Sequence, residues 1–142
     1  MKTVFCVGVF DMLHKGHVLL LERARALGGM LIVAIVKDPA VTNAKGQGRP
    51  IISAFDRAYI VSRLSCVDEV YLIDDFDPTP LLRLLTEVQG KRIDTIVIGE
   101  DQKHIDFSWA KNNNIDTVKL KRTSGVSTSD IVKKLGDKDA SH

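Results

Sequence analysis

Two of the chain's four histidines, His14 and His17, stand three residues apart in the stretch GVFDMLHKGH. Side chains at this spacing lie on the same face of a helix, so the two rings would point toward one place. A helix that begins here would offer backbone N–H groups and partial positive charge to a phosphate. Gly16 leaves room for such a ligand to approach the backbone. In the structural alternative His14 only caps the helix and His17 only packs, but the pair favours a functional role.

The elements that must position this pair follow from the apolar pattern. Short, mostly β-branched apolar segments, typical of strands buried on both faces, occur at residues 3–10, 30–36, 67–73, 95–98 and 117–120. Helical patterns occupy residues 17–29, 53–64, 77–90 and 127–135, a further short helix is expected before the last strand, and 37–50 has the composition of a long polar loop. This alternation predicts an α/β fold: a doubly wound, Rossmann-like open parallel sheet of about five strands with helices on both faces.

The predicted sheet also indicates where a ligand would bind. In open parallel sheets, ligands bind beyond the carboxyl ends of the strands, where the strand order reverses. Polar clusters follow three of the predicted strands, at residues 10–17, 99–102 and 122–129. We therefore expect these three segments to form one site.

The composition limits the classes of protein to which the chain can belong. Its 142 residues fit one domain, predicted over 1–135 with a frayed tail at 136–142, and the net charge of +2 is too small to favour nucleic acid or a membrane surface as a partner. Cys6 and Cys66 each lie in an apolar segment without a nearby base, which indicates core thiols in a reducing compartment. The apolar N-terminal run is too short for a signal peptide or a membrane span. These features predict a soluble, cytoplasmic protein.

Two stretches carry a resemblance to a known family. GVFDMLHKGH resembles the signature G-x-F-D-x-x-H-x-G-H of the cytidylyltransferase-like nucleotidyltransferase superfamily, and RTSGVSTSDI resembles its second signature, R-T-x-G-[IV]-S-T-[ST]. The resemblance covers residues 4–135 and implies transfer of a nucleoside monophosphate from a nucleoside triphosphate to a phosphorylated small molecule, with release of pyrophosphate. It also implies Mg²⁺ carried by the nucleotide, no metal held by the protein itself, and a homodimer. Such a reaction requires alignment of two mutually repelling anions and stabilisation of charge on the α-phosphate.

The resemblance implies catalytic roles for three residues. His14 and His17 would donate hydrogen bonds to the α-phosphate in the transition state, so loss of either would lower the rate by a factor on the order of 10²–10³. Lys45, in the polar loop, would reach over the triphosphate. Lys37 and Arg49 are rival candidates for that contact, and any of the three could instead be solvated.

The remaining predicted contacts with substrate come from several parts of the chain. Arg57 would bind the acceptor's phosphate, with a surface salt bridge to Asp56 or a neighbour as the alternative. Asp11 is expected first to hold the turn, with organisation of Mg²⁺ as its alternative, and Ser127 would also cap a helix. The predicted nucleotide-binding and phosphate-binding residues are Val9, Phe10, Asp11, Gly16, Asp101, Arg122, Thr123, Gly125, Ser127 and Thr128.

Longer stretches bear on the identity of the substrates. GQGRP, DRA and LSCVD resemble the heptose-phosphate adenylyltransferase module of lipopolysaccharide core synthesis, which predicts ATP and a sugar phosphate. RTSGVST is similar to CTP-dependent glycerol-3-phosphate and choline-phosphate cytidylyltransferases, and IGEDQK to archaeal-type FAD synthetases, which adenylylate FMN. Gln102 stands where the family has an aromatic residue, which weakens any prediction of how a base is stacked. A non-catalytic nucleotide-binding module and a flavodoxin-like electron carrier are the alternatives from other classes, although the retained motif residues and the few aromatic residues disfavour them.

Overall fold

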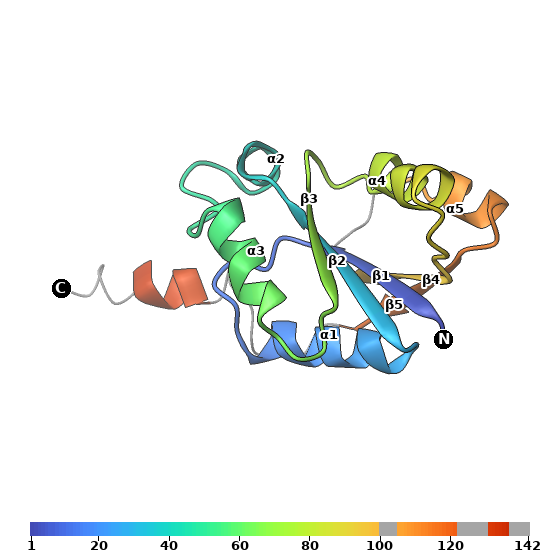
Figure 1. Ribbon diagram of the computed structural model, residues 1–142. Helices are drawn as coiled ribbons and strands as arrows, with labels where there is room; N and C mark the ends of the chain where they lie inside the picture. The colour runs from blue at the N-terminus through green and yellow to red at the C-terminus, as the bar shows by residue number, and fades with distance from the viewer. Residues whose placement is uncertain (100–104, 122–130, 137–142) are drawn as a thin grey trace.

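The computed structural model describes residues 1–99, 105–121 and 131–136 of the chain (Figure 1). Its elements are, in chain order, β1 (Thr3–Gly8), α1 (Lys15–Ala26), β2 (Met30–Val36), α2 (Asp38–Lys45), α3 (Ala54–Ser62), β3 (Glu69–Ile73), α4 (Thr79–Arg83), the π-helical turn η1 (Leu84–Val88), β4 (Thr95–Gly99), α5 (Ser108–Asn112) and β5 (Asp116–Leu120). Residues 131–136 are also helical. Strands and helices thus alternate along most of the described chain.

Within these residues, five strands form one parallel sheet in the order β3-β2-β1-β4-β5. β1 is central: Val4 pairs with Leu31 of β2 on one side and with Thr95 of β4 on the other. The chain extends the sheet from β1 through β2 to β3 and then returns to the other side of β1 for β4 and β5. The strand order therefore reverses between β1 and β4, so the switch point lies at the carboxyl ends of these two strands. The predicted fold class is confirmed.

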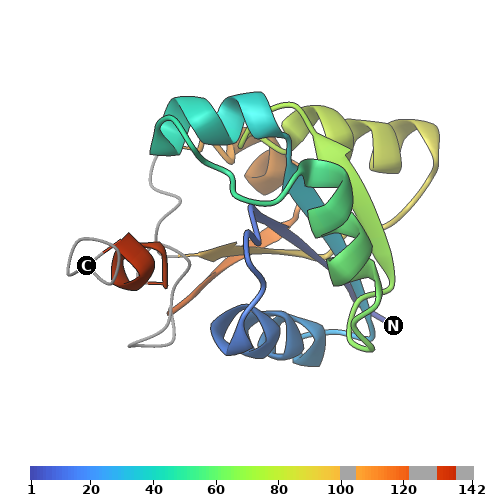
Figure 2. The same cartoon turned by 90° about the vertical axis from the view of Figure 1, so that its left-hand side faces the viewer.

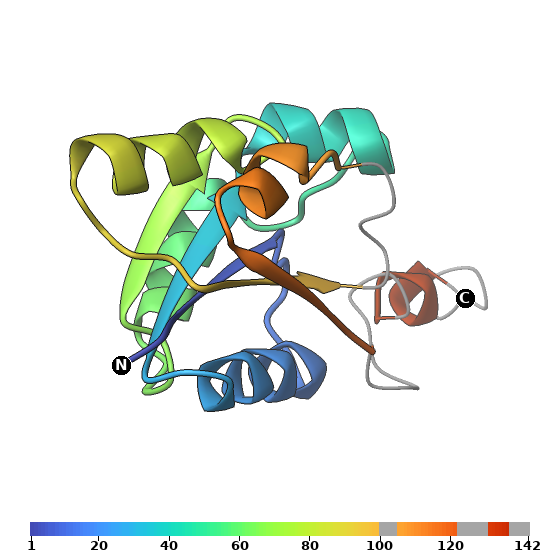
Figure 3. The ribbon, with the colours of Figure 1, turned by 90° about the vertical axis from the view of Figure 1, so that its right-hand side faces the viewer.

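Helices cover both faces of the sheet (Figures 2 and 3). Successive side chains of a strand point to opposite sides, so strands that are apolar throughout need a covering layer on each face. In β1, Phe5 and Val7 belong to one buried cluster, whereas Val4 and Cys6 belong to the other. The first cluster includes buried side chains of α2, α4, η1 and α5, and the second includes those of α1 and α3. Each Å² of apolar surface removed from water contributes about 25 cal/mol, so these two clusters are the main source of stability. With both faces covered, the carboxyl edge of the sheet is left to carry a site.

The boundaries of the predicted strands are close to the observed ones. β2 spans residues 30–36 as predicted, and the other four strands begin or end within two residues of their predicted limits. β1 stops at Gly8 because Phe10 has a left-handed φ of 54°, which a strand does not accommodate. The helix predicted at 77–90 is α4 continued by η1, and the short helix expected before the last strand is α5.

The prediction of a long loop at 37–50 is wrong, because most of this segment is α2. Asp38 and Pro39 occupy the first turn of α2, Lys45 lies in its last turn, and Gly46 ends it with a φ of 98°. An acidic residue and proline at the start and a basic residue at the end suit the backbone geometry and dipole of a helix. Of its eight residues only Val41 is buried, so the segment shows no apolar period that would reveal a helix.

Other predictions from the sequence are met only in part. Cys6 is 1% exposed, and burial raises the pKa of its thiol to about 12, as a core thiol requires. Cys66 is partly exposed, and partial burial raises its thiol pKa as well. Across the described ranges, no helix is both long enough and apolar enough to cross a bilayer. The single-domain boundary stays a prediction, since residues 137–142 lie outside the described ones.

Candidate functional site

The turn between β1 and α1 has an unusual backbone. Phe10 and Met12 both have left-handed φ values, 54° and 51°, each of which costs a residue with a side chain about 1–2 kcal/mol. Burial compensates, since Phe10 is 5% and Asp11 2% exposed. Gly8 makes the turn possible: a Cβ there would lie 2.5 Å from Cε2 of Phe10. The turn is therefore fixed in one shape by its surroundings.

His14 and His17 cap α1 reciprocally. The His14 Nδ1 accepts a hydrogen bond from the Gly16 N–H at 3.1 Å, and the His17 Nδ1 accepts one from the His14 N–H at 3.2 Å. The two rings stack with centroids 3.8 Å apart and planes 23° from parallel. The edge-to-face contact between Phe10 and His17, at 5.5 Å, buttresses the second ring. The two histidines therefore cap the helix, as the structural alternative expects, and their rings also lie together, as the functional interpretation expects.

The capping hydrogen bonds assign the tautomer of both histidines. A neutral imidazole carries one proton, and a ring nitrogen that accepts a hydrogen bond cannot be the one that holds it. Because Nδ1 is the acceptor in His14 and in His17, the proton of each neutral ring is on Nε2. Each ring can therefore act as a donor through Nε2 while Nδ1 holds the backbone. α1 has no acidic residue in its first turn, which also favours an anion at this end of the helix.

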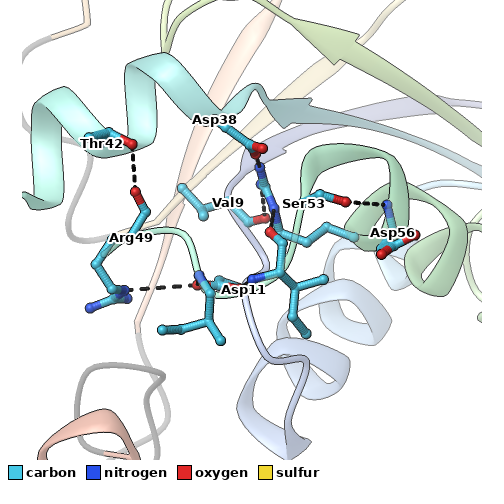
Figure 4. Close-up of polar contacts among 10 residues, drawn as sticks. Val9, Asp11, Asp38, Thr42, Arg49, Ser53 and Asp56 are labelled. Carbon is cyan, nitrogen blue, oxygen red and sulfur yellow. Dashed lines mark hydrogen bonds and ion pairs between the residues drawn. The ribbon is translucent and has the colours of Figure 1, made fainter. Parts of the chain in front are cut away.

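Asp11 links this turn to a segment 40 residues further along the chain (Figure 4). Its carboxylate accepts hydrogen bonds from the N–H groups of Ile51 and Ile52, at 2.6 and 2.9 Å. The Nε of Arg49 lies 3.8 Å from Oδ2 of the same carboxylate. Asp11 thereby holds the 49–52 segment against the histidine turn.

Arg57 is a second link to the same turn. Its side chain is fully buried and donates from Nη1 to the Val9 carbonyl at 2.7 Å and from Nε to the Ile52 carbonyl at 2.8 Å. Its Nη2 forms a 2.6 Å ion pair with Asp38 at the start of α2. The alternative of a surface salt bridge with Asp56 is therefore wrong: the partner is Asp38, and the guanidinium is buried. Binding of the acceptor's phosphate by Arg57 stays a prediction.

The three basic candidates of the 37–50 segment lie in different surroundings. Lys37 forms an exposed ion pair with Asp74 at 3.0 Å, and Lys45 is exposed in the last turn of α2. Arg49 is largely buried beside Asp11, and its carbonyl accepts a 2.6 Å hydrogen bond from the hydroxyl of Thr42. Through this contact with Asp11, the structure places Arg49 against the histidine turn.

Part of the predicted site lies outside the described residues. Those predicted residues are Asp101, Arg122, Thr123, Gly125, Ser127 and Thr128, together with Gln102. Of the three predicted polar segments only 10–17 lies wholly within the described residues, so their convergence stays a prediction. Sequence reasoning also missed Asp38 as the partner of Arg57. Its signal was its position, since it is an acidic residue two positions after a predicted strand, at the carboxyl edge.

Comparisons with known proteins identify the family. The family model described as cytidylyltransferase-like matches residues 5–134. The bifunctional protein HldE of Helicobacter pylori (strain P12) is 39% identical over 137 residues, covering 94% of this chain and 28% of that protein. HldE of Campylobacter concisus (strain 13826) is 39% identical over 140 residues, covering 96% of this chain and 27% of the relative. The chain thus spans little more than a quarter of the length of these curated relatives.

Solved structures agree with this relationship. The lipopolysaccharide core biosynthesis protein from Thermoplasma volcanium superposes with a TM-score of 0.68 at 27% identity, covering 87% of this chain and 99% of that one. Thermotoga maritima TmcAL bound with alpha-thio ATP gives a TM-score of 0.66 at 16% identity, covering 99% of this chain and 51% of that one, a likeness that shows the fold alone. Because the family model matches nearly the whole length of the chain, the chain belongs to the cytidylyltransferase-like family of nucleotidyltransferases.

Proposed function

We propose that this chain transfers a nucleoside monophosphate, with ATP as the favoured donor, to the phosphate of a sugar phosphate and releases pyrophosphate. The observation that carries the proposal is the stacked pair of His14 and His17, held by reciprocal caps at the N-terminus of α1 beside the switch point of the sheet. The resemblance to HldE and to a lipopolysaccharide core biosynthesis protein supports a sugar-phosphate acceptor.

The proposed reaction is a direct displacement at phosphorus. An oxygen of the acceptor's phosphate forms a bond to the α-phosphorus, the bond from this phosphorus to the bridging oxygen of the β-phosphate breaks, and pyrophosphate leaves with that electron pair. His14 and His17 donate from Nε2 to the α-phosphate as negative charge builds on its oxygens. Their rings are already fixed through Nδ1, so no reorganisation is needed at the moment of reaction. No proton has to be removed from the acceptor, because its phosphate oxygen is already anionic.

Among the described residues, no group of three or more His, Cys, Asp or Glu side chains is placed to hold a metal ion. Asp11, the carboxylate nearest the histidines in sequence, accepts two amide hydrogen bonds, which suits a structural role. Mg²⁺ stays a prediction from the resemblance, as a cation that would enter with the nucleotide, bound by phosphate oxygens and water. The homodimer stays a prediction, which sedimentation of the full chain would test.

The first experiment measures pyrophosphate release from ATP and from CTP, each with a panel of sugar phosphates, glycerol 3-phosphate and FMN. The proposal expects release with ATP and a sugar phosphate. Release with CTP and glycerol 3-phosphate, or with ATP and FMN, would contradict the proposed substrates and assign that other pair, while nucleotide transfer would remain the reaction. Nucleotide binding without release in any combination would contradict the proposal and favour a binding module.

A matched pair of variants separates the two roles of His17. Asparagine places its side-chain oxygen about where histidine carries Nδ1, so His17→Asn preserves an acceptor for the His14 N–H and removes Nε2. His17→Ala removes both groups. We expect both variants to lose turnover by a factor on the order of 10²–10³. His17→Asn should keep the thermal stability that His17→Ala partly loses, and near-normal turnover in His17→Asn would contradict the assignment of Nε2.

A further inference from the structure

Arg49 is a buried cation whose hydrogen-bonding groups are not all used. Its side chain is 13% exposed, and its Nε and Nη2 are buried without a hydrogen-bond partner among the described residues. These two N–H groups form one edge of the planar guanidinium, the edge that can bind both oxygens of a carboxylate or two oxygens of a phosphate. Burying polar N–H groups without acceptors is unfavourable, so such an edge indicates a partner from outside the described residues.

Asp11 does not supply that partner. The distance from Nε of Arg49 to Oδ2 of Asp11 is 3.8 Å, beyond the range of a hydrogen bond. The same oxygen already accepts a 2.6 Å hydrogen bond from the Ile51 N–H, and the other oxygen accepts one from the Ile52 N–H. Asp11 therefore attracts the guanidinium by charge and keeps it near the turn, while no described residue supplies an acceptor for the Nε and Nη2 hydrogens.

The backbone that carries Arg49 is held on both sides. Thr42 of α2 donates from its hydroxyl to the Arg49 carbonyl at 2.6 Å, and two residues later the amides of Ile51 and Ile52 are bound to Asp11. Arg57 donates to the Ile52 carbonyl at 2.8 Å. Figure 4 shows the side chain of Arg49 lying beside Asp11, below α2. The donor edge is thus positioned before any ligand arrives, next to the turn that carries the histidine pair.

We propose that the Nε and Nη2 edge of Arg49 binds a phosphate group of the substrates through two parallel hydrogen bonds. The inference rests on the proposed function, because it takes the histidine turn to be a site of phosphate chemistry. The ligand group is a phosphoryl group with two oxygens available, which either the polyphosphate of the nucleotide or the phosphate of the acceptor provides. Lys45, exposed at the end of α2, would contribute only a point charge.

The test compares Arg49→Met, Arg49→Lys and the control Arg83→Met in the full chain. Arg83 is an exposed arginine whose partner is Glu87 in the same helical stretch, so its loss changes the net charge equally without touching the turn. Affinities for ATP, pyrophosphate and glucose 1-phosphate are measured by titration calorimetry, and folding is checked by circular dichroism and thermal unfolding. Loss of paired, charge-assisted hydrogen bonds should weaken binding about 10–100-fold in Arg49→Met.

Arg49→Lys distinguishes a binding role from simple neutralisation of Asp11. Lysine restores a positive charge beside the carboxylate but not the two parallel donors, so it should recover thermal stability while binding stays several-fold weaker than in the wild type. Weakened ATP and pyrophosphate binding assigns the edge to the nucleotide, and weakened glucose 1-phosphate binding assigns it to the acceptor. The proposal is overturned if Arg49→Lys binds all three probes as tightly as the wild type, or if Arg83→Met weakens binding equally.

These outcomes are separate from those of the proposed function. If the Arg49 variants lose phosphate binding while the wild type never releases pyrophosphate, the anion site stands and the transfer reaction fails. If the wild type transfers nucleotide and the Arg49 variants match it in affinity, the reaction stands and the role of Arg49 fails.

Discussion

Replacing Arg57 by methionine is the sharpest test of how the turn after β1 is held. Methionine keeps much of the aliphatic volume of arginine and removes all three donors. The carbonyls of Val9 and Ile52 then lose partners at 2.7 and 2.8 Å, and the carboxylate of Asp38 loses one at 2.6 Å. The three acceptors belong to the turn directly after β1, to the segment before α3 and to α2, so the substitution removes contacts from three parts of the site at once.

The size of the effect follows from the burial of each acceptor. Asp38 has a side chain that is 43% exposed and can return to water, so its share is at most about 1 kcal/mol. A carbonyl left without a donor costs about 1–3 kcal/mol where it is fully buried, and the Val9 and Ile52 carbonyls are half-buried, so each costs about 1 kcal/mol. The desolvation of the guanidinium, which is recovered when it is removed, offsets part of this sum. We expect Arg57→Met to lower the free energy of unfolding by about 2–3 kcal/mol, a substantial fraction of the 5–15 kcal/mol typical of a domain.

Urea denaturation followed by circular dichroism measures this change. Arg83→Met is the matched control, because it removes an exposed arginine from an i,i+4 pair worth about 0.3–0.5 kcal/mol. Asp38→Asn keeps an oxygen acceptor and should cost less than about 1 kcal/mol. A loss below 1 kcal/mol in Arg57→Met would refute the reasoning, and an equal loss in Asp38→Asn would show that the ion pair, not the carbonyls, dominates.

The same variant tests the predicted contact between Arg57 and the acceptor's phosphate. Loss of the three contacts lowers the stability in either case, and displacement of the histidines should lower kcat with it. If Arg57 also binds the acceptor, Arg57→Met should in addition raise the KM for the acceptor. The predicted contact with the acceptor is therefore tested by the KM, and an unchanged KM for the acceptor would contradict it.

Three further predictions follow from other parts of the structure. Gly8→Ala should destabilise the protein by about 1–3 kcal/mol and lower turnover, because the new Cβ would lie 2.5 Å from the buried ring of Phe10; an unchanged melting temperature would contradict this. Burial raises the pKa of Glu69, but the hydrogen bonds from Lys91 and Tyr71 and the charge of Lys91 together outweigh this and the net pKa is lowered, so its contribution to stability is present above the unfolded pKa and lost as the pH falls through the folded one. The difference in unfolding free energy between wild type and Glu69→Gln should therefore shrink between pH 6 and pH 3, and a constant difference would contradict this. Cys6, with its thiol pKa raised to about 12 by burial, should resist a disulfide reagent at pH 8 until the protein unfolds, whereas two thiols reacting in the native state would contradict this.

The fold could be predicted because its signals are local and strong. The run MLIVAIV is apolar throughout, so β2 was predicted residue for residue, and its β-branched composition indicated a strand buried on both faces. The alternation of such runs with helical patterns was enough to predict a parallel doubly wound sheet. α2 was missed because only Val41 of its eight residues is buried, so neither an apolar period nor its length distinguished it from a loop.

The site could be predicted only as far as its residues are neighbours in sequence. The spacing of His14 and His17 was sufficient to place both rings together, since three residues correspond to about one helical turn. The hydrogen bonds between Asp11 and the amides of Ile51 and Ile52 could not be predicted, because backbone donors carry no sequence signal. The choice of Asp38 over Asp56 as the partner of Arg57 depends on the order of strands, which places α2 beside the turn.

These links show that the histidine geometry is not a property of α1 alone. Arg57 binds the carbonyl of Val9 at the start of the turn, Asp11 binds the 51–52 amides in its middle, and His14 closes it by capping the helix. The left-handed backbone at Phe10 would relax if any of these three were lost, because nothing local favours it. The two histidines would then move together, since His17 is bonded to the backbone of His14. Substitutions in the 49–57 segment should therefore lower kcat, because they shift the two histidine rings away from the position that stabilises the transition state. This effect should occur even at residues that touch no substrate.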